Sequence, residues 1–156
     1  MSQINIGDQA PEITAINQHE EEIKLSNFLG KKVILYFYPR DNTPGCTTEA
    51  CNFRDNYEEL SENGYVVLGV STDGLSSHQK FATKHELPFH LLVDEEKNIV
   101  NQYGVWVEKN MYGRKYMGTA RTTFLIDEKG VVRDIIKKVK NKEATKQVLE
   151  AWKQIQ

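Results

Sequence analysis

The sequence predicts one α/β domain built on a mixed β-sheet. Apolar, strand-like runs alternate with segments of helical periodicity, which favours parallel strands joined by right-handed crossovers. Nearer the C-terminus, two strand-like runs flank the turn Glu128-Lys129-Gly130, with glycine where a left-handed residue is needed. The chain has 156 residues, enough for a single domain with a core, and shows no internal repeat or linker. We therefore expect residues 1–156 to form one domain.

The N-terminal half is expected to open with a β-hairpin and then alternate strand and helix. Residues 33–38 are an unbroken apolar and aromatic run, and residues 65–71 are rich in valine, as in strands buried on both faces. In chain order we expect a hairpin of residues 13–16 and 22–25, a helical turn at 26–30, a strand at 33–38, a helix from 44 to 63 and a strand at 65–71.

The C-terminal half continues the alternation and closes with antiparallel strands and a helix. Leu87-Pro88 ends one helix that a serine begins, and a final segment carries an apolar stripe at helical spacing. We expect a helix from Ser76 or Ser77 to residue 86, a strand at 91–93, a helix at 97–103, an irregular segment at 105–118, strands at 122–127 and 131–138, and a helix at 143–155.

This order predicts a central mixed sheet with helices on both faces, an N-terminal β-hairpin and antiparallel strands at one edge. The thioredoxin-like architecture has this form. A flavodoxin-like strand order remains an alternative on the pattern alone.

Composition excludes several classes of protein. Apolar residues make up 39% and charged residues 27% of the chain, as in a globular protein, and the net charge of −2 implies no general attraction to nucleic acid or anionic membranes. No apolar run is long enough to span a bilayer. Residues 1–11 lack the pattern of a signal peptide, so we expect a cytoplasmic protein, in which cysteines are catalytic, metal-binding or buried rather than paired as a structural framework.

Both cysteines lie in the stretch P-R-D-N-T-P-G-C-T-T-E-A-C, residues 39–51, at a predicted strand-to-helix junction. Thr43 suits the N-cap of the helix and Pro44 suits its first position. Cys46 then lies in the first turn, among unpaired N–H groups at the positive end of the helix dipole. Both features favour a thiolate, the nucleophilic form of cysteine.

An arginine close to Cys46 would favour the thiolate further. The candidates are Arg40, Arg54, Arg114, Arg121 and Arg133. The pattern does not choose among them, although Arg121 begins a predicted core strand, where an ordinary surface arginine is least expected.

The spacing of Cys46 and Cys51 is informative. Five residues of helix rise about 7.5 Å and turn about 140°, which separates the Cα atoms by roughly 8–9 Å, whereas a disulfide needs about 4.4–6.8 Å. A disulfide between them therefore requires the start of the helix to unwind, and no C-x-x-C exchange motif is present. Cys46 shares a stripe with Ala50 and Phe53 that faces the core, and Cys51 lies off it.

Other interpretations of these residues are open. Either cysteine could be an inert buried residue, although a Thr-Pro-Gly cap makes this less expected for Cys46. Two cysteines without a nearby histidine do not complete a typical metal site. The histidines show no ligand spacing and are expected in surface or core roles: His19, His78, His85 and His90.

The chain closely resembles the peroxiredoxins, and among them the bacterioferritin-comigratory-protein (PrxQ-like) subfamily. The family pattern P-x-x-x-T-x-x-C is matched by Pro39, Thr43 and Cys46, and the resolving cysteine of the subfamily by Cys51. The family arginine is matched by Arg121 in T-A-R-T-T-F-L-I-D. G-D-Q-A-P-E at residues 7–12 and V-S-T-D at 70–73 also fit, so the likeness covers nearly the whole chain.

The resemblance implies a role for each of these residues. Cys46 would attack the peroxide as a thiolate and become a sulfenic acid, and Cys51 would condense with it to a disulfide. Thr43 would hydrogen-bond peroxide and thiolate, Arg121 would stabilise the thiolate and the leaving oxygen, and Pro39 would shield the pocket. Glu49 also matches a family residue that would orient an arginine.

The resemblance further implies a thiol peroxidase that reduces hydrogen peroxide and organic hydroperoxides and is recycled by thioredoxin. It implies no metal, haem or flavin, a monomeric state and a role in antioxidant defence. Two alternatives use the same fold: a redox sensor or chaperone that changes shape on oxidation, and a thioredoxin-like binding module without chemistry. Catalytic turnover with a reductant separates the enzyme from the sensor, and a binding module would not need Thr43 and Arg121 together with Cys46.

Overall fold

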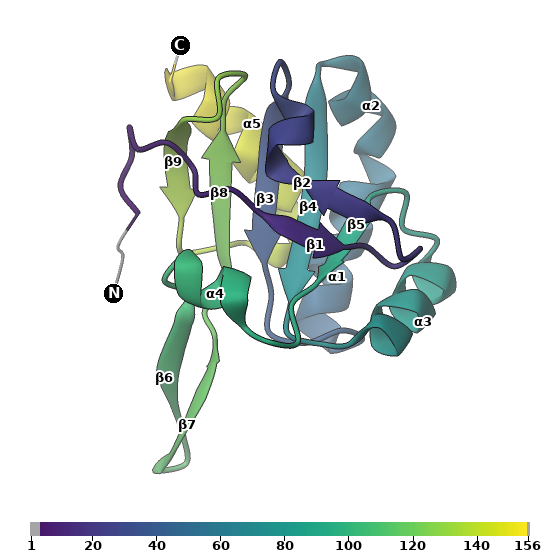
Figure 1. The fold of residues 1–156 in the computed structure, drawn as a ribbon, viewed down its shortest axis with the longest axis vertical. Coiled ribbons are helices and arrows are strands. Elements are labelled where there is room, and N and C mark those ends of the chain that lie inside the picture. The colour runs from purple at the N-terminus through teal and green to yellow at the C-terminus, as the bar shows by residue number, and fades with distance from the viewer. Residues whose placement is uncertain (1–3, 156) are drawn as a thin grey trace.

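A five-stranded sheet forms the centre of the computed structural model, which describes residues 4–155 (Figure 1). Its strand order is β5-β4-β3-β8-β9. These strands are β3 (Lys32–Phe37), β4 (Tyr65–Ser71), β5 (His90–Val93), β8 (Thr122–Ile126) and β9 (Val132–Ile136).

The sheet is mixed, as the sequence predicts. Strand β4 pairs in parallel with both β3 and β5. Strand β8 lies antiparallel to β3, and β9 lies antiparallel to β8. A flavodoxin-like sheet would be parallel throughout, so the antiparallel pairing of β3 with β8 excludes that alternative and agrees with the thioredoxin-like architecture.

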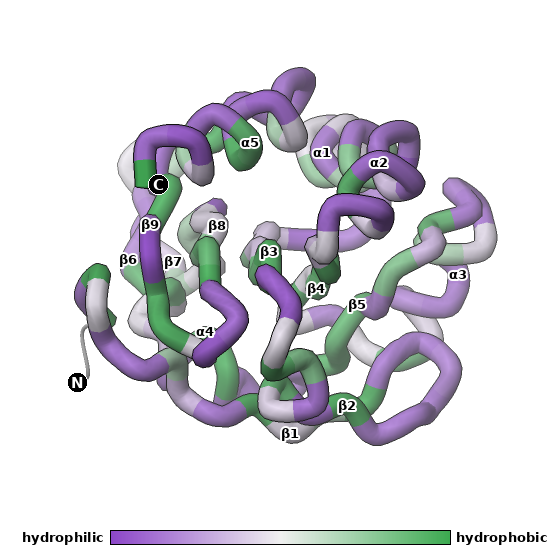
Figure 2. Tube along the Cα trace, turned by 90° about the horizontal axis from the view of Figure 1, so that it is seen from above, coloured by the Kyte–Doolittle hydropathy of each residue, from purple (hydrophilic) through white to green (hydrophobic). Residues whose placement is uncertain are grey.

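Helices and the N-terminal segments cover the two faces of the sheet (Figure 2). The helices α1 (Pro44–Asp55), α2 (Tyr57–Glu62) and α5 (Ala144–Ile155) lie on one face. The hairpin of β1 (Thr14–Ile16) and β2 (Glu22–Lys24) lies on the other face with α4 (Asn98–Gln102) and the 3-10 helix at Leu25–Phe28. Helix α3 (Leu75–His85) lies beside the β5 edge, and a second 3-10 helix, Asn141–Glu143, precedes α5.

The alternation of side chains along β3 explains the two cores. Ile34 and Tyr36 join the core under α1 and α5, whereas Val33, Leu35 and Phe37 join the core under the β1–β2 hairpin. Every residue of β3 after Lys32 is buried. This is why the segment appears in the sequence as an unbroken apolar run rather than as an alternating one.

Two helix predictions need correction. The helix expected at 44–63 is broken at Asn56, which ends α1 and precedes α2. The side chain of Asn56 donates to the carbonyl of Asn52, an alternative to the regular backbone ladder. Helix α3 begins at Leu75 with Gly74 as its N-cap, not at either serine.

The segment at 105–118, expected to be irregular, is instead a β-hairpin of β6 (Trp106–Met111) and β7 (Arg114–Thr119). Tyr112 and Gly113 form its turn with φ angles of +53° and +78°, as a two-residue hairpin turn requires. The arm projects from the body of the protein (Figure 1). No helix within residues 4–155 is long and apolar enough to cross a membrane.

Candidate active site

Cys46 lies where the chain leaves the central strand β3 and enters α1. Thr43 is the N-cap in an extended conformation and Pro44 is the first helical residue, so Cys46 is in the first turn. The carbonyl of Thr43 accepts a hydrogen bond of 2.8 Å from the N–H of Thr47. The side chain of Cys46 packs into the core under α1 and is only 1% exposed. The helix therefore presents this thiol at its positive end, inside the protein.

Arg121 reaches Cys46 from the junction between β7 and β8. Its Nη2 donates to the sulfur of Cys46 at 3.1 Å, and its Nη1 donates to Oε1 of Glu49 at 2.7 Å. Burial lowers the pKa of Arg121, but the neighbouring Cys46 and Glu49 raise it above its ordinary value on balance. The guanidinium is thus a fixed cation that bridges two residues one helical turn apart.

The other candidate arginines lie elsewhere. Arg54 pairs with Asp55 and Arg133 with Asp127, while Arg40 and Arg114 are exposed. Within residues 4–155, Arg121 is the arginine that the structure records in contact with Cys46.

Glu49 supplies the buried carboxyl group of the site. Its side chain is fully buried, and its Oε2 has no hydrogen-bond partner among the described residues. Burial raises the pKa of Glu49 from its ordinary 4.5 to about 7, although Arg121 opposes the rise. The residue therefore holds Arg121 in place at a cost in stability when it is ionised.

Gly45 leaves room for Arg121 beside the helix. A Cβ atom at this position would lie 3.3 Å from Nη2 of Arg121 and 3.0 Å from Nδ2 of Asn141. Such contacts are tighter than ordinary packing allows, so a side chain at 45 would push the guanidinium away from the sulfur.

A second cation was missed by the sequence analysis. Lys109 of β6 is close enough to the site that its pKa is lowered by burial and by the charge of Arg121, with Cys46 acting in the opposite sense. Gly118 of the paired strand has no side chain, and a Cβ there would lie 3.2 Å from Cδ of Lys109. The β6–β7 arm therefore adds positive charge near Cys46.

Thr43 and Pro39 flank the thiol along the chain. Both are half-buried. The Thr43 hydroxyl donates to the carbonyl of Arg40 at 3.0 Å, a bond that leaves its oxygen lone pairs available as acceptors. It makes no side-chain cap of α1. The predicted contact of this hydroxyl with thiolate and peroxide stays a prediction.

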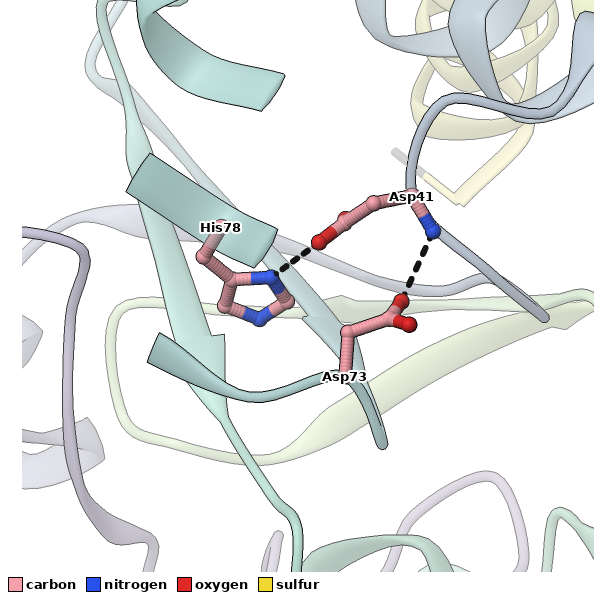
Figure 3. Close-up of side chains that lie close together, drawn as sticks. All are labelled: Asp41, Asp73 and His78. Carbon is pink, nitrogen blue, oxygen red and sulfur yellow. Dashed lines mark hydrogen bonds and ion pairs between the residues drawn. The ribbon is translucent and has the colours of Figure 1, made fainter. Parts of the chain in front are cut away.

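A buried polar cluster supports the loop that precedes α1 (Figure 3). His78 of α3 contacts Oδ2 of Asp41 through Nδ1 at 2.6 Å and the carbonyl of Leu92 through Nε2 at 2.8 Å. The backbone N–H of Asp41 donates to Asp73 at 2.7 Å, and the hydroxyl of Tyr38 donates to Asp41 at 2.6 Å. The loop carrying Thr43 is therefore tied to α3 and to the end of β4.

The chemistry of this cluster is that of a hydrogen-bonded ion pair. Asp41, Asp73 and His78 have ligand atoms within 4.8 Å of one another, as a metal site would. These groups, however, already bond each other or neighbouring hydroxyl and backbone groups. Burial lowers the pKa of His78, but the hydrogen bond and charge of Asp41 raise it above its ordinary value on balance. His78 therefore has the core role expected of it.

Cys51 lies further along α1 and is half-buried, with its sulfur 3.9 Å from Nδ1 of His85. Both cysteines are free thiols in this structure. The structure thus places Arg121 in contact with both Cys46 and Glu49. Cys51 lies instead against His85 of α3.

Comparison with known proteins gives consistent similarities over most of the chain. Residues 6–135 match the model of the AhpC/TSA family. The chain is 53% identical over 137 residues to the putative peroxiredoxin bcp of Coxiella burnetii, covering 88% of this chain and 91% of that protein. It is 47% identical over 150 residues to peroxiredoxin Bcp of Bacillus subtilis, covering 96% of each.

Solved structures agree. A cysteine-to-serine mutant of Xylella fastidiosa PrxQ superimposes with a TM-score of 0.91 at 31% identity, covering 99% of this chain and 98% of that one. The bacterioferritin comigratory protein of Xanthomonas campestris has a TM-score of 0.85 at 32% identity, covering 92% of each chain. That protein was solved as a trapped intermediate/ligand complex that concerns its alkyl peroxide reduction activity.

Proposed function

Because the chain belongs to the AhpC/TSA family and is a peroxiredoxin, a thiol peroxidase, we propose that Cys46 attacks the peroxide and that Cys51 resolves the product. The observation that carries this assignment is the guanidinium of Arg121, 3.1 Å from the sulfur of Cys46 at the start of α1. A cation and a helix N-terminus both favour the thiolate, which is the form that reacts.

In the first step, the Cys46 thiolate attacks one oxygen of the O–O bond. A sulfur–oxygen bond forms, the O–O bond breaks, and the other oxygen leaves as hydroxide or alkoxide. Negative charge moves from sulfur to the leaving oxygen, so a fixed cation that spans both positions lowers the barrier. Arg121 has this role in the proposal, with Lys109 as a second positive charge and Glu49 holding the orientation of Arg121.

Two residues before the thiol complete the pocket in this proposal. The lone pairs of the Thr43 oxygen accept a hydrogen bond from the hydroperoxide O–H, and Pro39 limits the access of water to the sulfur. The Asp41 cluster fixes the loop between Pro39 and Thr43, because Asp41 bonds to His78 of α3 and to Asp73, which follows β4. Neither role requires a metal or an organic cofactor.

In the second step, Cys51 condenses with the Cys46 sulfenic acid to form an intramolecular disulfide and water. The two cysteines occupy one intact helix, so the first turns of α1 must unwind before the sulfur atoms can meet. A dithiol protein of the thioredoxin type then reduces the disulfide and restores both thiols.

The proposed substrates are hydrogen peroxide and organic hydroperoxides, the second supported by the alkyl peroxide activity named for the Xanthomonas campestris relative. We further propose a cytoplasmic, monomeric, single-domain enzyme of antioxidant defence and redox homeostasis.

The experiment is peroxide consumption with thioredoxin, its reductase and NADPH. Wild type should turn over, Cys46→Ser should be inactive, and Cys51→Ser should lose thioredoxin-dependent turnover while still reacting once with peroxide. Normal turnover by Cys46→Ser would overturn the assignment. Oxidation without repeated turnover in wild type would instead favour a redox sensor.

A further inference from the structure

The thiol of Cys51 has a chemically suited neighbour. Its sulfur lies 3.9 Å from Nδ1 of His85, the last residue of α3. The other ring nitrogen, Nε2, is buried and has no hydrogen-bond partner within residues 4–155. The ring also packs edge-on against Phe81, with centroids 5.3 Å apart. The imidazole is therefore held in place, with one nitrogen directed at a thiol.

The surroundings of His85 disfavour protonation of its ring. Burial, followed by the positive charges of Lys84 and Arg54, lowers the pKa of His85 below its ordinary 6.5. Arg54 of α1 also donates to the backbone carbonyl of His85 at 2.9 Å, and the charge of Glu86 helps to raise the pKa of Arg54. A neutral imidazole carries its proton on one ring nitrogen and a lone pair on the other. The tautomer that can accept a proton from Cys51 has its proton on Nε2 and its lone pair on Nδ1, facing the sulfur.

Cys51 stands in the anchored part of α1. The next residue, Asn52, accepts a hydrogen bond of 2.8 Å from the N–H of Thr145 and donates one of 2.8 Å to the carbonyl of Lys142. Ala50 and Phe53 are fully buried. Cys46 lies in the first turn of α1, with its sulfur against Arg121. Unwinding the first turn would therefore bring Cys46 toward Cys51 while Cys51 stays beside His85.

We propose that His85 is the proton acceptor for the resolving thiol, an inference that rests on the two-cysteine reaction proposed above. Nδ1 of His85 takes the proton of Cys51, and the resulting thiolate attacks the sulfur of the Cys46 sulfenic acid. The S–S bond forms as the S–OH bond breaks. The leaving hydroxide takes the proton back from the imidazolium, so the products are the disulfide and water, and His85 is regenerated.

The test is a rapid-mixing measurement on His85→Asn, with His19→Asn, at an exposed histidine, as the matched control. Hydroperoxide is mixed with the reduced protein, and mass spectrometry of quenched samples follows first the Cys46 sulfenic acid and then the disulfide. We expect His85→Asn to form the sulfenic acid at the wild-type rate. The disulfide should form roughly 100-fold more slowly near neutral pH, at the lower end of what a positioned base contributes.

The pH dependence separates a base from a structural role. Thiols ionise unaided at alkaline pH, so the rates for His85→Asn and wild type should converge by about pH 9.5. If His85 only holds α1 in place, His85→Asn would form the disulfide faster than wild type, and that result would overturn the inference. Equal rates of disulfide formation near neutral pH would overturn it as well. Absence of a Cys46–Cys51 disulfide in wild type would instead overturn the two-cysteine reaction itself.

Discussion

Replacing Glu49 with glutamine is expected to stabilise the protein and slow the enzyme at the same time. The carboxyl group is fully buried, and its pKa rises from 4.5 to about 7 on folding. Each pKa unit corresponds to about 1.4 kcal/mol, so ionised Glu49 costs the folded state about 3 kcal/mol. Glutamine keeps the shape and an oxygen for Arg121, but carries no charge.

The pH dependence follows from the sign of this shift. The unfolded chain loses the Glu49 proton near pH 4.5, whereas the folded protein holds it to about pH 7. Wild-type stability therefore falls across this window relative to Glu49→Gln, and the difference stays constant above it. The stability advantage of the variant should grow by about 3 kcal/mol between roughly pH 4.5 and pH 8.

Denaturant unfolding at both pH values measures this change, with Glu58→Gln, on the exposed face of α2, as the control. The rate of the reaction with peroxide should fall in Glu49→Gln, although the stability rises. A charge-assisted hydrogen bond is about 1 kcal/mol stronger than a neutral one, so kcat/KM for peroxide should fall roughly fivefold. If Glu49→Gln differs from wild type in stability by the same amount at about pH 4.5 and pH 8, burial does not destabilise the ionised Glu49 and the assignment is wrong.

Three further substitutions probe the site and its support. Arg121→Met removes a charged hydrogen bond of about 2–3 kcal/mol to the thiolate and should lower kcat/KM about 30- to 150-fold in stopped-flow assays, while the exposed Arg40→Met should have no effect. Gly45→Ala should lower kcat/KM by displacing the guanidinium, and an unchanged rate would show that the close approach is not needed. His78→Gln breaks the buried pair with Asp41 and should cost about 3–5 kcal/mol of stability. That loss should be fully present below pH 6.5 and shrink as the pH rises through the raised pKa of His78, which unfolding across a pH series would reveal.

Local sequence patterns predict the central sheet well, because its inner strands β3, β4 and β8 are buried on both faces. The run at 33–38 has no polar interruption, and its valine-rich counterpart at 65–71 pairs with it in parallel. The glycine turn at Gly130 marks the antiparallel hairpin in the same way. The apolar side chains on both faces of the inner strands must be buried, and a central strand of a covered sheet is the structure that buries both faces.

The β6–β7 arm could not be predicted from periodicity. Its strands are mostly exposed on both faces, so they show none of the alternation that marks a half-buried strand. The sequence patterns did not identify Lys109 as a site residue, because it approaches Cys46 only when the β6–β7 hairpin forms. The Tyr112-Gly113 pair was the available signal for a turn.

The partners of the site are separated along the chain, which limits what spacing can show. Cys46 and Arg121 are 75 residues apart, and Asp41 and His78 are 37 apart. The sequence pattern alone left five arginines as candidates for the cation beside Cys46, and the family resemblance selected Arg121. The contact of His85 with Cys51 had no sequence signal, because it depends on how α3 packs against α1.

The most direct test of the central claim is mass spectrometry of reduced protein treated with a stoichiometric amount of hydroperoxide. We expect wild type to yield a peptide pair joined through Cys46 and Cys51. Cys51→Ser should instead carry a single added oxygen on Cys46. Peroxide consumption with Cys46 still a free thiol, or with the oxygen on another residue, would contradict the account.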